Sequence, residues 1–221
     1  MGFENRVTFS FYHPKWEAAD RHCAVAAPMY DPTMTPTDLL VPTYQHMLQT
    51  LSGLLDKVQQ QMPHQAETAL EARLAADMFP LATQVRFAAF QAQEAVFRLR
   101  GERIPDWLDA IAAEARNAGD AAGTIADAKA RLNDALSFLA DLSSSDLDAG
   151  ARLPIAIELP GGMTFDMTGE QYVRDWALPQ FYFHVITAYA ILRNQGVTIG
   201  KADYVPHMFA YLRPGTMPSG S

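Results

Sequence analysis

A histidine in an uncharged, apolar stretch is the first residue of this sequence that could do chemistry. The stretch FYFHVITAYAIL, residues 181–192, contains His184 and no formal charge. Imidazole can act as an acid, a base or a metal ligand near neutral pH. At helical spacing His184 shares a face with residues that predict the interior of a helix bundle, namely Val173, Ala177, Gln180, Ala188 and Ile191.

A buried His184 has two alternative roles. Burial disfavours the charged imidazolium, so we expect a neutral ring whose N–H finds an acceptor, because an unpaired buried polar group costs about 1–3 kcal/mol. In the first role the ring is a hydrogen-bonded part of the core. In the second it is a ligand or a base at a pocket between helices. The other histidines are expected in terminal segments, in a loop or on an exposed helix face.

Asp77 is the second candidate, and it lies in ARLAADMFPLATQV, residues 72–85, just ahead of a predicted helix. Its carboxylate either caps that helix by accepting from the first-turn amides, or serves as a metal ligand or acid/base partner near His184. We expect Gln84, Gln180 and Tyr189 to line the pocket around these two residues.

Composition and motifs exclude several other functions. The sequence has no glycine-rich phosphate loop, no GxSxG elbow and no HExxH motif. Lys and Arg total 17 against 25 for Asp and Glu, and the formal charge of −8 opposes nucleic-acid binding. The single Cys23 cannot form an internal disulfide, and no apolar run reaches the roughly 18–20 residues of a membrane helix. We therefore expect a cytoplasmic protein with neither nucleic-acid nor membrane partners.

Hydrophobic periodicity predicts four long helices that must position these side chains. Helices are expected from Pro42 to about residue 61, over 78–100, over 124–142 with Thr124 as N-cap, and over 169–195. Shorter helices are expected over 67–74 and 105–116. Pro42 fits the first turn of the first helix, and Pro179 should interrupt the last helix near Asp175.

A β-hairpin is predicted between the third and fourth long helices. In RLPIAIELPGGMTFDMTG the apolar residues alternate on both sides of Pro160-Gly161-Gly162. A turn centred on Gly161 pairs Ile157 with Phe165 and Ile155 with Met167. All the alternating apolar residues then share one face, which should pack on the helices.

The chain is expected to form one domain with two terminal extensions. At 221 residues with 49% hydrophobic and 19% charged residues, it is long enough and apolar enough for one folded core. Residues 1–28 lack periodicity and are predicted to be a disordered extension, residues 29–206 the domain, and residues 207–221 a flexible tail.

The last helix carries a resemblance to a known family. ALPQFYFHVITAYAILRNQGVTIGKADY, residues 177–204, resembles the signature of a bacterial and fungal family of domains of unknown function in the DinB/YfiT-like superfamily. ARLAADMFPLATQV, the PGG turn and MYDPT at residues 29–33 resemble that family too. The resemblance implies an all-α, DinB/YfiT-like four-helix bundle with a β-hairpin between helices three and four.

The resemblance also implies where a metal would lie. The superfamily includes proteins regarded as metalloenzymes and thiol-dependent transferases, whose metal, where present, is held by three histidines, two of them in an HxxxH pair on the last helix. His184 matches the first of that pair, Ala188 stands in place of the second, and Asp77 lies roughly where an earlier helix contributes its ligand. Two ligands retain a divalent metal weakly unless Gln84 or Tyr189 completes the shell, so the sequence favours no metal.

Two functional hypotheses follow. The first is a small-molecule-binding protein, or an enzyme with an altered metal site, whose pocket surrounds His184 and Asp77. The alternative is a non-catalytic helical module that forms a homodimer through surplus apolar surface on the second and fourth long helices. The residues do not decide between an enzyme and a binding protein.

Overall fold

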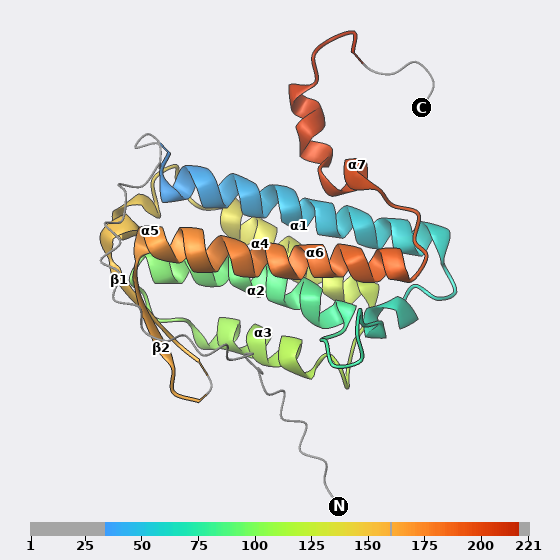
Figure 1. The fold of residues 1–221 in the computed structure, drawn as a ribbon, viewed down its shortest axis with the longest axis horizontal. Helices are drawn as coiled ribbons and strands as arrows, with labels where there is room; N and C mark the ends of the chain where they lie inside the picture. The colour runs from blue at the N-terminus through green and yellow to red at the C-terminus, as the bar shows by residue number, and fades with distance from the viewer. Residues whose placement is uncertain (1–33, 160, 217–221) are drawn as a thin grey trace, which may run out of the picture. The chain divides into compact units, whose positions relative to one another are not determined.

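Four helices pack side by side around one apolar core: α1 (Pro36–Gln61), α2 (Leu81–Leu99), α4 (Ile125–Ala140) and α6 (Leu178–Asn194). This is a computed structural model, and it describes residues 34–159 and 161–216. Contacts join α1 to α4, α4 to α2, α2 to α6 and α6 to α1, so the helices close a ring (Figure 1). The predicted four-helix bundle is confirmed.

Shorter elements connect and cover these helices. The helix α3 (Asp106–Asn117) packs on α2, and β1 (Pro154–Glu158) and β2 (Thr164–Thr168) form the hairpin between α4 and α6. None of the helices in the described part of the chain combines the length and hydropathy that crossing a membrane requires. The remaining elements are η1 (Thr68–Glu71), η2 (Asp148–Arg152), α5 (Gly169–Gln171), η3 (Tyr172–Ala177), α7 (Lys201–Tyr204) and η4 (Pro206–Tyr211).

The structure describes only part of the predicted terminal extensions. Residues 1–28 and the predicted domain start near Met29 lie outside the described residues. At the other end, η4 carries helical structure into the segment predicted as a tail, and Met208, Phe209 and Tyr211 are exposed there.

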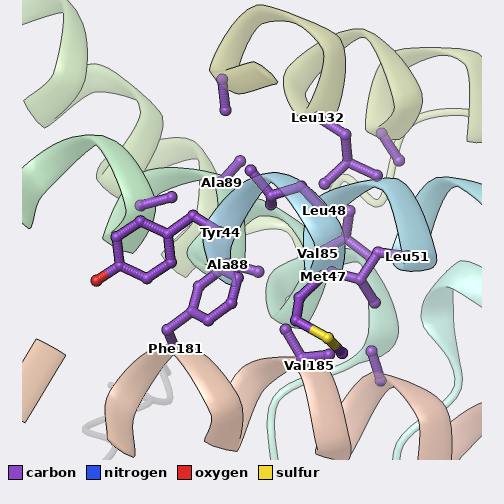
Figure 2. Close-up of a cluster of buried hydrophobic side chains, with 14 of the residues drawn as sticks. Tyr44, Met47, Leu48, Leu51, Val85, Ala88, Ala89, Leu132, Phe181 and Val185 are labelled. Carbon is purple, nitrogen blue, oxygen red and sulfur yellow. The ribbon is translucent and has the colours of Figure 1, made fainter. Parts of the chain in front are cut away.

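The helix α1 forms as hydrophobic periodicity predicts, with an apolar stripe facing the core, but its predicted start is wrong. The helix begins at Pro36 rather than near Pro42, because Thr35 and Asp38 form a capping box that satisfies the first amides. Pro42 lies inside the helix on its exposed side. The stripe is fully buried, and Figure 2 shows its residues Tyr44, Met47, Leu48 and Leu51 packed among side chains of the other bundle helices. The whole stripe consists of Tyr44, Met47, Leu48, Leu51, Leu54, Leu55 and Val58.

The helix α2 is buried on nearly every side, because α6, α3 and α4 all pack against it. Its apolar positions from Leu81 to Leu99 are buried, and polar residues between these positions are buried as well. The helix begins at Leu81 rather than near residue 78, with Pro80 as its N-cap. Because burial extends all round, each polar side chain of α2 needs a partner inside the protein.

Pro179 interrupts the last long helix, as predicted, and the interruption takes the form of a π-helix. Proline lacks the N–H that would bond the carbonyl of Asp175. Just before it, the six residues of η3 adopt wider turns, and the Leu178 N–H bonds Val173 O, five residues back. The regular helix α6 resumes at Leu178 and ends before Gly196, whose φ of 87° suits glycine.

The hairpin has the predicted register but only half of the predicted burial. Ile155 pairs with Met167 and Ile157 with Phe165. Both isoleucines are buried, whereas Phe165 is 44% exposed and contacts Trp176. The prediction that one face is buried across both strands is therefore wrong for Phe165, while the half-buried Met167 of β2 still packs against the core.

The hairpin is tied to the bundle by close backbone contact. A Cβ atom at Gly150 would lie 2.0 Å from Leu99 O, and one at Gly169 would lie 1.9 Å from Gly150 O. Beside this crossing, the Asp148 carboxylate accepts from Thr37 Oγ1 at 2.6 Å, and Thr37 Oγ1 accepts from Leu147 N at 3.0 Å. These contacts fix η2 and α5 against the ends of α1 and α2.

We predict that alanine at two glycines changes stability in opposite directions. Gly150→Ala should lower the free energy of unfolding by about 3 kcal/mol, because backbone cannot move away from the added methyl group. Gly53→Ala should raise it by about 0.5–1 kcal/mol, because this glycine lies within α1 and nothing lies within 4 Å of an added Cβ. Urea unfolding of both variants tests this, and equal effects would contradict the close crossing.

Candidate functional site

His184 is buried between α6 and α2, with 8% of its surface exposed. Its Nδ1 lies 2.8 Å from Oε1 of Gln84, which is itself buried. The Gln84 Nε2 donates to the Phe79 carbonyl at 3.1 Å, and this leaves the amide oxygen facing the imidazole. An amide oxygen only accepts, so the proton of the neutral imidazole is on Nδ1.

The other ring nitrogen, Nε2, then carries a lone pair. It makes no hydrogen bond with the described residues, and it is not among their fully buried unpartnered atoms. Two aromatic rings contact the imidazole: Phe87 stacks on it with 5.1 Å between centroids, and Phe183 meets it edge-on at 5.5 Å. His184 therefore presents an acceptor in an aromatic setting.

Burial lowers the pKa of His184 from 6.5 to about 4. No carboxylate opposes this effect, and the hydrogen bond to Gln84 suits the neutral ring. A base with such a low pKa has little driving force to remove a proton from a substrate at neutral pH. The geometry supports a hydrogen-bond acceptor better than a general base.

Asp77 does not cap α2. It lies exposed in the turn between η1 and α2, and Pro80 occupies the N-cap position. Within the described residues its carboxylate has no hydrogen bond or ion pair, and none of the contacts of His184 involves it. Its pairing with His184 stays a prediction.

The three residues predicted to line the pocket lie in different settings. Gln84 bonds His184 directly, and Gln180 is half-buried one helical turn before it on α6. Tyr189 is also half-buried, but its ring contacts Tyr204 of α7 at 5.6 Å. Gln84 therefore contacts His184, and Gln180 lies on the same face of α6. The Tyr189 ring instead contacts α7.

The residues do not fit a metal centre of the kind that the resemblance implies. Ala188 occupies the place of the second histidine and is completely buried. Across residues 34–159 and 161–216, no three His, Cys, Asp or Glu side chains gather in a way that could hold a metal. A histidine with one amide partner and two aromatic contacts is instead suited to an organic ligand.

The sequence did not identify Phe79 or Phe87 as part of the site. In the sequence Phe87 is one more apolar residue of its helix, and Phe79 supplies a backbone carbonyl that no side-chain pattern marks. The available signal was spacing, because Gln84 and Phe87 lie three residues apart and share a face of α2.

We predict that His184 makes stability depend on pH between about 4 and 6.5. The unfolded chain binds a proton on this histidine below about 6.5, whereas the folded protein resists until about 4. The free energy of unfolding should therefore fall as pH drops through this window, by on the order of 3 kcal/mol from this residue. Urea unfolding at several pH values measures the slope.

The matched variant is His184→Gln, which should remove this part of the slope. His64→Gln, at an exposed histidine, should keep the slope of the parent protein. His207, whose pKa is also lowered by burial and by His46, is present in all three proteins. Parallel curves for the parent and His184→Gln would contradict a buried neutral ring.

Comparison with known proteins agrees with this fold. The chain matches the family described as a domain of unknown function, DUF1993, over residues 37–205. It is also similar to the crystal structure of a DinB family member protein from Shewanella denitrificans, with 30% sequence identity and a TM-score of 0.61. That similarity covers 84% of this chain and 94% of the other. No protein with a curated description matches.

The DUF1993 match spans the four bundle helices, the hairpin and His184. It ends just after α7, so it includes residues 72–85, the PGG turn and residues 177–204, whereas MYDPT at residues 29–33 lies outside it. The fold, the match and the resemblance agree: the chain belongs to the DUF1993 family of DinB-like domains.

Proposed function

We propose that this protein binds a small organic molecule whose hydroxyl or N–H group donates to Nε2 of His184. One observation carries the proposal: the ring is neutral and fixed by Gln84, yet its second nitrogen has no partner among the described residues. Binding sites of this kind combine apolar walls with a few oriented polar groups.

The surroundings of His184 define the class of ligand. Phe183 is 53% exposed and Phe87 stacks on the imidazole, so an aromatic or apolar body would find contact surface there. Gln180, one turn before His184, offers a second polar group. The net charge of −8 disfavours an anionic ligand. A neutral aromatic molecule with one hydrogen-bond donor fits best.

We also propose a cytoplasmic location for the protein, because a single cysteine, Cys23, cannot form an internal disulfide.

We predict that phenol binds at His184 and that anisole, which lacks the donor, binds about three- to tenfold more weakly, as loss of one hydrogen bond implies. Imidazole ¹⁵N spectra report the state of Nε2 during each titration. His184→Phe keeps an aromatic ring and should make the two ligands bind equally. Equal binding to the unaltered protein would refute the proposal.

Two further variants separate the parts of the site. Gln84→Leu removes the acceptor for Nδ1–H and should reduce the preference for phenol, because the proton can then move to Nε2. Asp77→Asn tests the sequence prediction that this carboxylate takes part. A change in phenol affinity would bring Asp77 into the site, and no change would leave the binding role to His184.

A second candidate function is a homodimer formed through α6. Phe183 and Ile186 are 53% and 51% exposed and lie three residues apart on that helix. This apolar surface supports the alternative of a non-catalytic module. Sedimentation velocity tests it: Ile186→Glu should abolish a dimer, whereas Met163→Glu, on an exposed hairpin residue, should not. A strictly monomeric parent protein would rule this candidate out.

A further inference from the structure

A cleft of about 420 Å³ lies between α2, α3 and α4, away from His184. One face of α3 forms its first wall, because Trp107, Ala110, Ile111 and Glu114 recur at helical spacing. The facing wall comes from Arg131, Asp134 and Phe138, at the same kind of spacing on α4. The three helices are labelled in Figure 1. The cleft is large enough for a small organic ligand.

Aromatic rings form one end of this cleft. Trp107, Phe138 and Phe97 contact one another in a triangle, with centroid distances of 5.9, 5.6 and 6.1 Å. Trp107 is nevertheless 47% exposed, so part of the indole remains open to a ligand. Exposed faces of tryptophan and phenylalanine attract cations through the negative potential above the ring.

Gln93 forms the buried polar part of the cleft. It belongs to α2 and is only 2% exposed, yet it lines the cleft. Its Nε2 donates to the Ala89 carbonyl at 3.0 Å, while its Oε1 has no hydrogen bond with the described residues and is not fully enclosed. The atom that Gln93 offers to a ligand is therefore an acceptor.

One carboxylate of the cleft, that of Asp134, is only weakly paired. Glu114 is occupied by Arg86 at 2.7 Å and by Arg131 at 2.9 Å. Burial disfavours the charged form of Glu114, but these two arginines outweigh it and lower its pKa. Asp134 has only a long contact to Arg131, at 3.6 Å, and its side chain is 64% exposed. The groups that a ligand can engage are thus the exposed Asp134 carboxylate, which keeps a long ion pair with Arg131, the Gln93 amide oxygen and the aromatic faces.

We propose that this cleft binds a small organic ammonium ion with an aromatic or apolar body. The ammonium would donate to Asp134 and Gln93 Oε1, and the body would lie against Trp107 and Phe138. The net charge of −8 would also attract a cation to the protein. This site is separate from the one at His184. Its ligand is a cation, whereas the ligand proposed at His184 is a neutral hydrogen-bond donor.

Phenethylammonium, 2-phenylethanol and 3-phenylpropionate test the proposal, because they share a phenyl ring and differ in charge. We expect the amine to bind about tenfold more tightly than the alcohol, through an ion pair and a cation–π contact, and the acid to bind most weakly. Tryptophan fluorescence, with Trp107→Phe as the reference for the two other tryptophans, and amide NMR shifts measure binding. Equal affinities, or shifts that lie outside α2, α3 and α4, would overturn the proposal.

Matched variants locate the site without disturbing the fold. Asp134→Asn should reduce the advantage of the amine about threefold, whereas Asp109→Asn, at an exposed α3 residue outside the cleft, should not. Ala110→Leu should fill the cleft and abolish binding, whereas Ala113→Leu on the same helix should leave it unchanged. His184→Phe should not affect the amine, which separates this result from phenol binding. Binding that survives Ala110→Leu would refute this location.

Discussion

The near-complete burial of α2 is the constraint on which the rest of the structure depends. A helix enclosed by three neighbours is destabilised by each buried polar atom left unbonded, and among the described residues of α2 only Gln91 Oε1 is fully buried without a partner. Arg86 is an example, since it donates to the carbonyls of Ala82 and Ala122 as well as to Glu114. Thr83 donates to the Ala115 carbonyl in the same way. These bonds attach α3 and its following loop to the bundle, where apolar contact alone would leave the position of α3 less well defined.

The same constraint explains why two dissimilar sites lie along one helix. Gln84 and Gln93 are nine residues apart, which is about half a revolution beyond two full turns. One amide therefore faces α6 and the other faces α3 and α4. Each amide donates its N–H to a backbone carbonyl and keeps its oxygen for another group. At one site that oxygen orients an imidazole, and at the other it lines an open cleft.

Much of this fold follows from the sequence because local patterns encode it. The α1 stripe, the Thr124 cap and the hairpin register each depend on residues close together in the chain. The predicted start of α1 was wrong because Thr35 caps the helix upstream of Pro42. The predicted start of α2 was wrong because Pro80 is itself the residue before the helix. The exposed face of β2 could not be read from alternation, since alternation does not tell which strand lies against the helices.

The candidate site was less accessible to sequence reasoning. His184 was found because its chemistry contrasts with its neighbours, and Gln84 was expected near it. The bond between the two, which lie 100 residues apart in the chain, is visible only in the tertiary structure. The cleft was missed entirely, since Trp107, Gln93 and Asp134 come from three helices and form no motif. The six residues of η3 affect His184 in a further way. Their wider turns rotate the residues that follow by about 100° about the helix axis, compared with a regular α-helix of the same length. The phase of α6, and hence the side of the bundle on which its imidazole emerges, is set by a local change in backbone winding two turns upstream.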